Sequence, residues 1–267
     1  MGIKKFLKSA KKFGKAFKKV IRGGGGSGSM ILKRGSSGAD VKNMQEYLTA
    51  LGYDTKGVEG TFEGGTESAV KAFQKDMSFT VVDGIIGNQT AKHLVDMYYG
   101  KVVPFGYVTN TPWVSEAIED YFVSEIKGEK HNPRVVQYFK DAHSSWFTDD
   151  ETPWCAAAVS SWLERAGIRS VRSARARDHI NFGTKLLEPR FGAIVVLERG
   201  ANSGHVGFVN GVTADGKQIK VLGGNQSDSV NERMFQVTRV LGYRQPEGFV
   251  LPPCPIVGKG ELSKSEA

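Results

Sequence analysis

Residues 152–167 read TPWCAAAVSSWLERAG, and this stretch decides what the second half of the chain can form. Thr152 suits a helix N-cap, Pro153 the first helical position and Gly167 the C-terminal cap. Cys155 is therefore expected in the first turn, where free N–H groups and the helix dipole stabilise an anion and lower a thiol pKa toward neutrality. A thiolate is the nucleophile that amide cleavage needs, and a buried structural cysteine is the alternative interpretation.

A hairpin downstream of this helix carries a candidate base. Residues 191–198 alternate as a strand, and residues 204–209, GHVGFV, begin another. Asp215-Gly216 then turns the chain into residues 218–223, which predicts an antiparallel pair. His205 enters this hairpin in a glycine-flanked strand, whereas the other four histidines lie in the N-terminal half or in polar helical and loop contexts: His93, His131, His143 and His179.

The register of the hairpin decides which side chain lies beside His205. If residues 214–216 form a three-residue loop with Gly216 in the left-handed conformation, Asn225 lies opposite His205. A two-residue turn sets Gln226 there instead. In either register an amide side chain can accept the ring N–H and fix the tautomer and orientation of the imidazole, as the third member of a nucleophile, base and orienting set.

Three separated motifs resemble the CHAP-type cysteine, histidine-dependent amidohydrolases and peptidases of phage and bacterial lysins. They occur in the family's order, as TPWCAA at 152–157, GHVGFV at 204–209 and LGGNQSD at 222–228. The resemblance implies a papain-like α+β fold with an antiparallel sheet, assigned to a catalytic domain of residues 113–247. It also implies Cys155 as nucleophile, His205 as general base and then acid, and Asn225 as the orienting residue.

Residues 30–100 predict a small three-helix module, with helices that begin near Asp40, after Thr66 and at Thr90. The turns before the second and third helices repeat one pattern, in which an acid and a glycine precede a helix-capping threonine. Together with GSSGADV at 35–41, the pattern resembles the peptidoglycan-binding domain found beside many wall hydrolases. Bacterial peptidoglycan is the partner that this resemblance implies.

Residues 1–22 predict a cationic amphipathic helix. They hold eight lysines and one arginine with no acid, which gives this segment a charge of +9. Since the whole chain has a net charge of +8, the remaining residues sum to −1. Apolar side chains recur at three-four spacing, which is typical of helices that lie on anionic membranes or lipopolysaccharide; a solvated helix packed on the protein's own core is the alternative. The segment resembles the frog-skin peptide magainin with extra lysines. With the Gly/Ser linker 23–29 and Met30, it indicates an engineered antimicrobial fusion.

The remaining composition excludes several classes. The near-neutral bulk argues against nucleic acid as a partner. Two cysteines cannot form a disulfide framework, and no segment is apolar enough for a membrane span or a signal peptide. We expect a monomer whose parent lysin is made in the host cytoplasm and acts on the wall, with the fusion applied externally. Residues 101–112 are interpreted as a linker and residues 248–267 as a tail.

These patterns predict a peptidoglycan hydrolase that cleaves a wall amide by a Cys-His-Asn mechanism, as an N-acetylmuramoyl-L-alanine amidase or a stem-peptide endopeptidase, without a metal or cofactor. Two alternatives stay open. A zinc-dependent wall hydrolase would pair with such a binding module, but the ligand spacings of zinc sites do not occur. A membrane-disrupting peptide on an inert wall-binding scaffold would need no catalysis.

Overall fold

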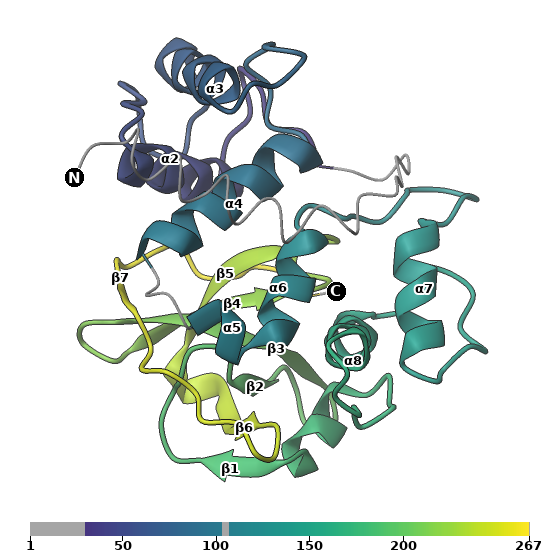
Figure 1. Cartoon of the computed structure of the whole chain (residues 1–267). Helices are drawn as coiled ribbons and strands as arrows, with labels where there is room; N and C mark the ends of the chain where they lie inside the picture. Colours follow the sequence, from purple (N-terminus) through teal and green to yellow (C-terminus); the bar gives the residue numbers. More distant parts are fainter. Residues whose placement is uncertain (1–29, 103–106, 267) are drawn as a thin grey trace.

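The computed structural model describes residues 30–102 and 107–266, so the predictions for the peptide 1–22 and the linker 23–29 fall outside it. A helical part, residues 30 to 102, lies against a larger part in which helices flank an antiparallel sheet (Figure 1). The predicted α+β class, with an antiparallel sheet domain preceded by a three-helix module, is confirmed. Within the described ranges, no helix has the length and apolarity needed to cross a bilayer.

The helical part consists of α2 (Ala39–Leu51), α3 (Gly64–Asp76) and α4 (Asn88–Val102). Each helix turns an apolar face inward, because side chains three and four residues apart share one side of a helix. The side chains that form this small core are fully or almost fully buried: Val41, Met44, Leu48, Val70, Phe73, Ile86, Leu94 and Val95.

The internal repeat is built around one glutamine on each of the first two helices. Gln45 accepts from Gly60 N at 2.7 Å and donates to the Thr66 hydroxyl at 2.9 Å. Gln74 does the same one helix later, through Gly84 N at 2.9 Å and the Thr90 hydroxyl at 3.3 Å. Each glutamine therefore holds the turn and the start of the following helix.

The two threonines of the repeat were expected to cap these helices, and that detail is wrong. α3 begins at Gly64, so Thr66 lies inside its first turn, and α4 begins at Asn88, so Thr90 does too. Their buried hydroxyls accept from the glutamines instead of capping the backbone. Burial of a polar hydroxyl is tolerated here because a partner satisfies it.

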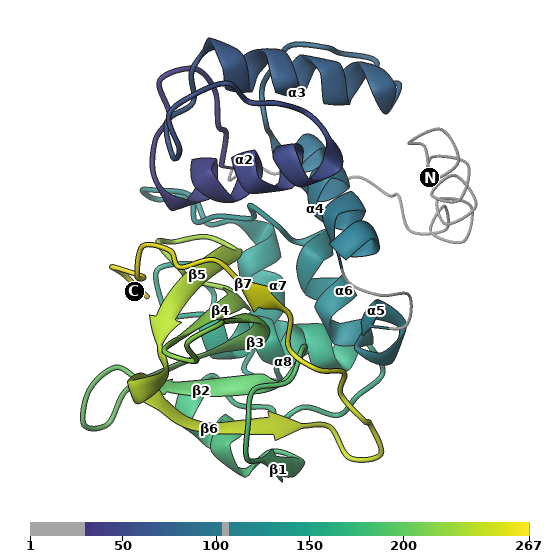
Figure 2. The ribbon, with the colours of Figure 1, turned by 90° about the vertical axis from the view of Figure 1, so that its left-hand side faces the viewer.

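The larger part contains, among its described residues, a seven-stranded sheet in the order β1-β6-β2-β3-β4-β5, with β7 added beside β3 (Figure 2). All pairs are antiparallel except β3 with β7. The strands are β1 (Thr184–Leu186), β2 (Ile194–Glu198), β3 (Gly204–Thr213), β4 (Gln218–Gly223), β5 (Asn231–Gln236), β6 (Val240–Gln245) and β7 (Ile256–Val257).

Four helices accompany the sheet: α5 (Tyr107–Asn110), α6 (Pro112–Glu119), α7 (Pro133–Asp141) and α8 (Cys155–Arg165). α8 packs against α6 and α7 on one side and against β3 on the other, which buries Trp162 against Phe208 with ring centroids 5.8 Å apart. Two short 3-10 helices, η1 (Ala176–Asn181) and η2 (Val237–Arg239), complete the regular elements. The central position of α8 fixes the residue at its start relative to the sheet.

The β3–β4 hairpin is confirmed, but its loop is longer than expected. Residues 214–217 connect the strands, and Gly216 has the left-handed conformation predicted for it, with φ of 66°. A bulge between Val209 and Gly211 offsets the extra loop residue, so that Phe208 still pairs with Leu222. The strand positions near His205 therefore follow the three-residue register although the loop has four residues.

The boundaries of α6 and α8 are set by local contacts. α6 ends at Glu119, because the following residues pair with the segment at Val230: Phe122 N donates to Val230 O at 2.8 Å. α8 begins at Cys155 with Trp154 as N-cap, so Thr152 and Pro153 precede the helix. Thr152 N is instead held by the Asp149 carboxylate at 2.6 Å.

The expected linker and tail are more ordered than their composition indicates. α4 reaches Val102 and α5 occupies part of residues 101–112. The tail packs back on the sheet: β7 lies beside β3, and Leu262 pairs with Met234 of β5. Both segments therefore contribute to the packed structure of the larger part.

Candidate active site

Cys155 lies at the first position of α8 and is 5% exposed. Burial raises the pKa of its thiol to about 11, while backbone N–H groups of Val206 and Ala156 favour the thiolate and act in the opposite direction. The sequence predicted a lowered pKa, which is wrong for the thiol in this buried position. The helix start does present N–H groups to the sulfur, but desolvation outweighs them.

His205 lies at the start of β3 and is fully buried. Its ring stacks on Phe235, with centroids 5.5 Å apart and planes inclined by 22°. Its Nε2 lies 3.0 Å from Oε1 of Gln226. Burial lowers the pKa of His205 to about 4, although the hydrogen bond to Gln226 opposes this effect.

The partners of Gln226 determine the tautomer of His205. The amide nitrogen of Gln226 donates to the backbone oxygens of Asn231 at 2.7 Å and Val221 at 3.3 Å, which leaves Oε1 as the acceptor facing the imidazole. Nε2 of His205 must then carry the hydrogen, and Nδ1 holds the free lone pair. Within the described part of the chain, Nδ1 has no hydrogen-bond partner. It is the ring atom available to accept a proton.

Among the described residues, Asn225 makes no hydrogen bond to the imidazole, which differs from the expected Cys-His-Asn arrangement. In the orientation that satisfies both amide atoms, its oxygen accepts from Trp154 N at 3.1 Å and its nitrogen donates to Glu125 at 3.2 Å. The reason is local: Asn225 has a φ of 56°, so the chain leaves the strand after Gly223 and strand alternation no longer applies. Gln226, the alternative left open by the sequence, is the residue that holds His205.

Cys155 and His205 are brought together through Val206. The backbone N–H of Val206 points to the Cys155 sulfur, and Val206 follows His205 directly in β3. Within the part of the chain that the structure describes, Nδ1 of His205 makes no hydrogen bond, so the thiol and the imidazole are not hydrogen-bonded to each other.

Glycines at the end of β4 make room for these side chains. A Cβ atom at Gly223 would lie 3.0 Å from Oε1 of Gln226 and 3.3 Å from Nε2 of His205. At Gly224 it would lie 2.5 Å from the Trp154 ring. The close approach of Gln226 and Trp154 explains why glycines stand at positions 223 and 224.

Sequence reasoning missed a carboxylate beside the helix start. Glu125 accepts from Trp154 Nε1 at 2.8 Å, and burial raises the pKa of its carboxyl group. No motif or spacing in the sequence links Glu125 to Cys155, so its role had no sequence signal. Together with Asn225, it ties the N-cap residue of α8 to the loop that follows β4.

The other histidines and acids considered at the outset lie elsewhere. His131 contacts the buried Asp150 at 2.9 Å, and Asp150 also accepts from the backbone N–H groups of Ile126 and Asn132. Asp150 therefore organises the loop before α7. Among the residues described, no three His, Cys, Asp or Glu side chains are grouped so that they could hold a metal ion.

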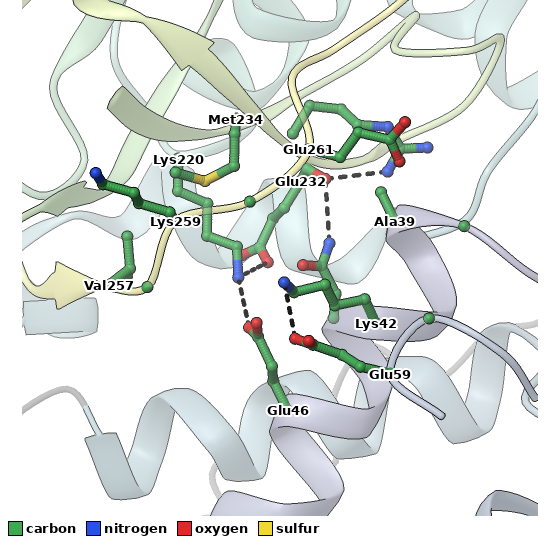
Figure 3. Close-up of a pocket in the computed structure, with 16 residues that line it drawn as sticks. Ala39, Lys42, Glu46, Glu59, Lys220, Glu232, Met234, Val257, Lys259 and Glu261 are labelled. Carbon is green, nitrogen blue, oxygen red and sulfur yellow. Dashed lines mark hydrogen bonds and ion pairs between the residues drawn. The ribbon is translucent and has the colours of Figure 1, made fainter. Parts of the chain in front are cut away.

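A cavity of about 290 Å³ lies between the two parts of the chain (Figure 3). Cys155 does not line it. The buried Lys220 lines it and pairs with Glu232 and Glu46, each at 3.5 Å. Glu232 also accepts from Asn210 at 2.7 Å and from the Tyr99 hydroxyl, and burial raises the pKa of its carboxyl group. This network joins the helical part to β4 and β5.

A bidentate ion pair strengthens the same junction. Arg233 of β5 donates to both carboxylate oxygens of Asp40 on α2, at 2.6 and 2.7 Å, and both side chains are about one-tenth exposed. Asn43 of α2 donates to the Glu232 backbone oxygen at 3.1 Å. α2 is therefore fixed directly on β5, as Figure 2 shows.

Two known families match parts of the chain. Residues 37–94 match the family described as a putative peptidoglycan binding domain, and residues 147–225 match the CHAP domain. This pair of domains supports an endolysin-like architecture. The second match contains Cys155, His205 and Asn225, and it ends one residue before Gln226.

Individual relatives cover smaller shares. The chain is 46% identical over 66 residues to N-acetylmuramoyl-L-alanine amidase CwlL of Bacillus licheniformis, which covers 24% of this chain and 18% of that protein. It is 32% identical over 77 residues to the spore cortex-lytic enzyme of Bacillus subtilis (strain 168), covering 28% of this chain and 25% of the relative. The chain thus spans a quarter or less of the length of these relatives.

Among solved structures, the chain is similar to a Staphylococcus aureus protein described as similar to a lipoprotein of the NLP/P60 family. The TM-score is 0.25 and the identity 10%, over 78% of this chain and 95% of that one.

Proposed function

We propose that this chain hydrolyses an amide bond of bacterial peptidoglycan, with Cys155 as nucleophile and His205 as general base and then acid. In this proposal residues 30–100 bind the wall and residues 113–247 carry the chemistry. The observation that supports it most directly is the position of Cys155 at a helix start beside Val206, with the neighbouring His205 held by Gln226 through Nε2. The matches to a wall-binding domain and a CHAP domain name the substrate class.

The first half of the reaction forms a thioester. His205 Nδ1 takes the thiol proton of Cys155, and the sulfur attacks the amide carbonyl carbon. N–H groups at the start of α8 stabilise the negative oxygen of the tetrahedral intermediate. His205 then returns the proton to the leaving nitrogen as the C–N bond breaks.

Hydrolysis completes the cycle. A water molecule gives a proton to His205 Nδ1 and attacks the thioester carbon, and the sulfur leaves and recovers the proton. Gln226 keeps Nε2 protonated throughout, so that Nδ1 is the atom that exchanges protons. We assign this orienting role to Gln226, and we assign to Asn225 the positioning of the Trp154 end of α8.

The resting site must open before this chemistry begins. Burial raises the pKa of Cys155 to about 11 and lowers that of His205 to about 4, so both groups are neutral at pH 7. Substrate or water entering the site would reduce the desolvation of the thiolate and the imidazolium. We therefore expect the reactive ion pair to form only when the site is accessible.

Turnover of purified, lipid-free peptidoglycan tests the assignment. Cys155→Ala should abolish the release of soluble fragments, whereas Cys254→Ala, which changes the other cysteine of the chain, should leave it intact. Mass spectrometry of the products should show new amine and carboxyl ends without new sugar reducing ends. Clearing by Cys155→Ala at the parent rate would refute the cysteine mechanism.

We also propose that residues 1–22 form a membrane-active peptide that was added to a lysin. The support is their charge, nine cations in 22 residues without an acid, together with apolar residues at the three-four spacing typical of an amphipathic helix. Such a segment binds anionic membrane or lipopolysaccharide and would help the enzyme reach the wall of Gram-negative cells.

A further inference from the structure

The segment of residues 262–266 lies against the catalytic half of the sheet. Leu262 pairs with Met234 in parallel, and Ser263 N donates to Met234 O at 2.9 Å. Further on, Ser227 N donates to Ser265 O at 3.0 Å. The 262–266 segment therefore runs beside β5 and ends at the loop that carries Gln226.

Two arginines hold the residue at the end of this segment. Arg239 donates to both carboxylate oxygens of Glu266, at 3.1 and 2.9 Å, and Arg199 donates to the Glu266 backbone oxygen at 2.6 Å. Glu266 is only 8% exposed in consequence. The two arginines thus contact the side-chain carboxylate and the backbone carbonyl of one residue.

The position of Arg239 does not depend on Glu266 alone. Its Nε donates to the Glu198 backbone oxygen at 3.0 Å, and its guanidinium lies 5.4 Å from the centre of the Phe235 ring. A guanidinium held in this way by a backbone oxygen and an aromatic ring is prepared to bind a planar carboxylate through two hydrogen bonds.

This arginine site adjoins the proposed catalytic base. Phe235, which contacts Arg239, also stacks on the ring of His205. Glu266 interacts electrostatically with His205, as do Arg239 and Arg199 with the opposite sign. A carboxylate bound here therefore lies on a guanidinium that contacts the same Phe235 ring as His205.

We propose that Arg239 and Arg199 form a subsite that recognises a carboxylate and the adjoining carbonyl of an acidic peptide, and that Glu266 occupies this subsite in the structure. The proposal rests on the proposed function and names one substrate determinant of the same site: a free carboxylate near the amide that is cut. Stem peptides of peptidoglycan carry such carboxylates. The 262–266 segment must leave before they bind.

The first experiment measures substrate preference. The probes are a purified muramoyl stem peptide with free carboxylates and the same compound with its carboxylates converted to carboxamides. The parent chain should have a kcat/KM about tenfold higher for the acid, the size expected for one charge-assisted contact. Arg239→Gln should reduce this ratio to about one, and Arg190→Gln, which changes an arginine in the surface pair with Glu188, should preserve it.

The second experiment tests whether Glu266 occupies the subsite, and it leaves Arg239 unchanged. Glu266→Gln should increase kcat/KM for the acidic stem peptide several-fold and accelerate the alkylation of Cys155 by iodoacetamide, read by peptide mass. Glu261→Gln is the matched control, because that carboxylate pairs with the exposed Lys264. Equal values for the two variants in both measurements would overturn the proposal for Glu266.

The outcomes separate the subsite from the proposed function. If Cys155→Ala hydrolyses the acidic stem peptide as fast as the parent, the cysteine mechanism fails whatever the arginines do. If Cys155→Ala is inactive but Arg239→Gln keeps the parent's preference for the acid, the mechanism stands and the subsite is wrong. Urea unfolding of each variant establishes that loss of preference does not reflect loss of the fold.

Discussion

Nε2 of His205 lies 3.0 Å from Oε1 of Gln226, and both side chains are fully buried. The amide nitrogen of Gln226 is bound to backbone oxygens on two sides, so the glutamine cannot turn over without breaking those bonds. The imidazole is therefore held in one tautomer by a neutral partner. A neutral partner fixes the ring but supplies no charge to stabilise an imidazolium.

Gln226→Leu should lower kcat/KM by about 10- to 100-fold, because loss of one buried hydrogen bond costs about 1–3 kcal/mol and frees the ring. Gln226→Glu keeps the acceptor and adds a charge, so it should raise the pKa of His205 and move the acidic limb of the pH–rate profile to higher pH. Kinetics across pH on purified walls measure both. Gln137→Leu, which removes a hydrogen bond to Asp141 on α7, is the control.

The same glycine that admits Gln226 should be intolerant of a methyl group. Gly223→Ala places a Cβ 3.0 Å from Gln226 and 3.3 Å from His205, so the pair must shift, and we expect a loss of about 1–3 kcal/mol in stability together with reduced turnover. Gly258→Ala is the matched control, because no atom lies within 4 Å of its added Cβ. Denaturation and wall turnover of the two variants should differ clearly; equal behaviour would contradict the tight packing.

Acid should destabilise the fold through two buried histidines. Burial lowers the pKa values of His205 and His179 to about 4, whereas both bind a proton near pH 6.5 when unfolded. Between these two pH values the unfolded chain binds more protons than the folded one, so the free energy of unfolding rises with pH. As the pH falls from about 6.5 to about 4, each histidine therefore lowers the free energy of unfolding by at most about 3 kcal/mol.

Urea unfolding at several pH values measures this dependence. His179→Gln should flatten the dependence in that window, and His93→Gln, at an exposed position, should leave it unchanged. An unchanged slope in His179→Gln would show that His179 is not buried in its neutral form.

The ion pair between Asp40 and Arg233 should be needed for stability. Arg233→Gln leaves the Asp40 carboxylate buried without its partner, which costs about 3–5 kcal/mol when a buried pair is broken on one side. Replacing both residues, Asp40→Leu with Arg233→Met, should be much less harmful because no charge is left unpaired. Urea denaturation of the parent, Arg233→Gln and the double variant measures the difference.

Deletion of residues 1–29 should separate the two activities of the chain. Hydrolysis of isolated walls should persist, while killing of intact Gram-negative cells should fall, because the cationic segment is then absent. A truncated chain that kills intact cells as well as the full chain does would contradict the membrane role. A truncated chain without wall hydrolysis would instead show that the segment supports the enzyme.

Much of this structure could be predicted because local sequence patterns determine it. The spacing of apolar residues predicted α2, α3, α4 and α8, and Asp215-Gly216 predicted the β3–β4 hairpin, since turn chemistry and periodicity act over a few residues. Cys155 at a helix start and His205 in a glycine-flanked strand were found in this way. The burial that raises the pKa of Cys155 could not be predicted from local patterns, because it depends on the whole fold.

The errors arose where distant segments decide the outcome. Asn225 was expected beside His205 because strand alternation was extended past Gly223, but three left-handed residues, at 225, 227 and 228, end the strand there. Glu125 comes from the segment between α6 and α7, and Glu266 from a segment that composition marked as a tail. Neither has a spacing relationship to Cys155, so only the tertiary structure brings them there.

The buried contacts between α2 and β5 keep the wall-binding helices at one orientation relative to Cys155. A molecule attached to peptidoglycan through those helices would present its cutting site at one constant offset from the point of attachment. Cleavage along an ordered wall would then occur at regular intervals around each anchored molecule, and loosening that junction would broaden the distribution of fragment sizes.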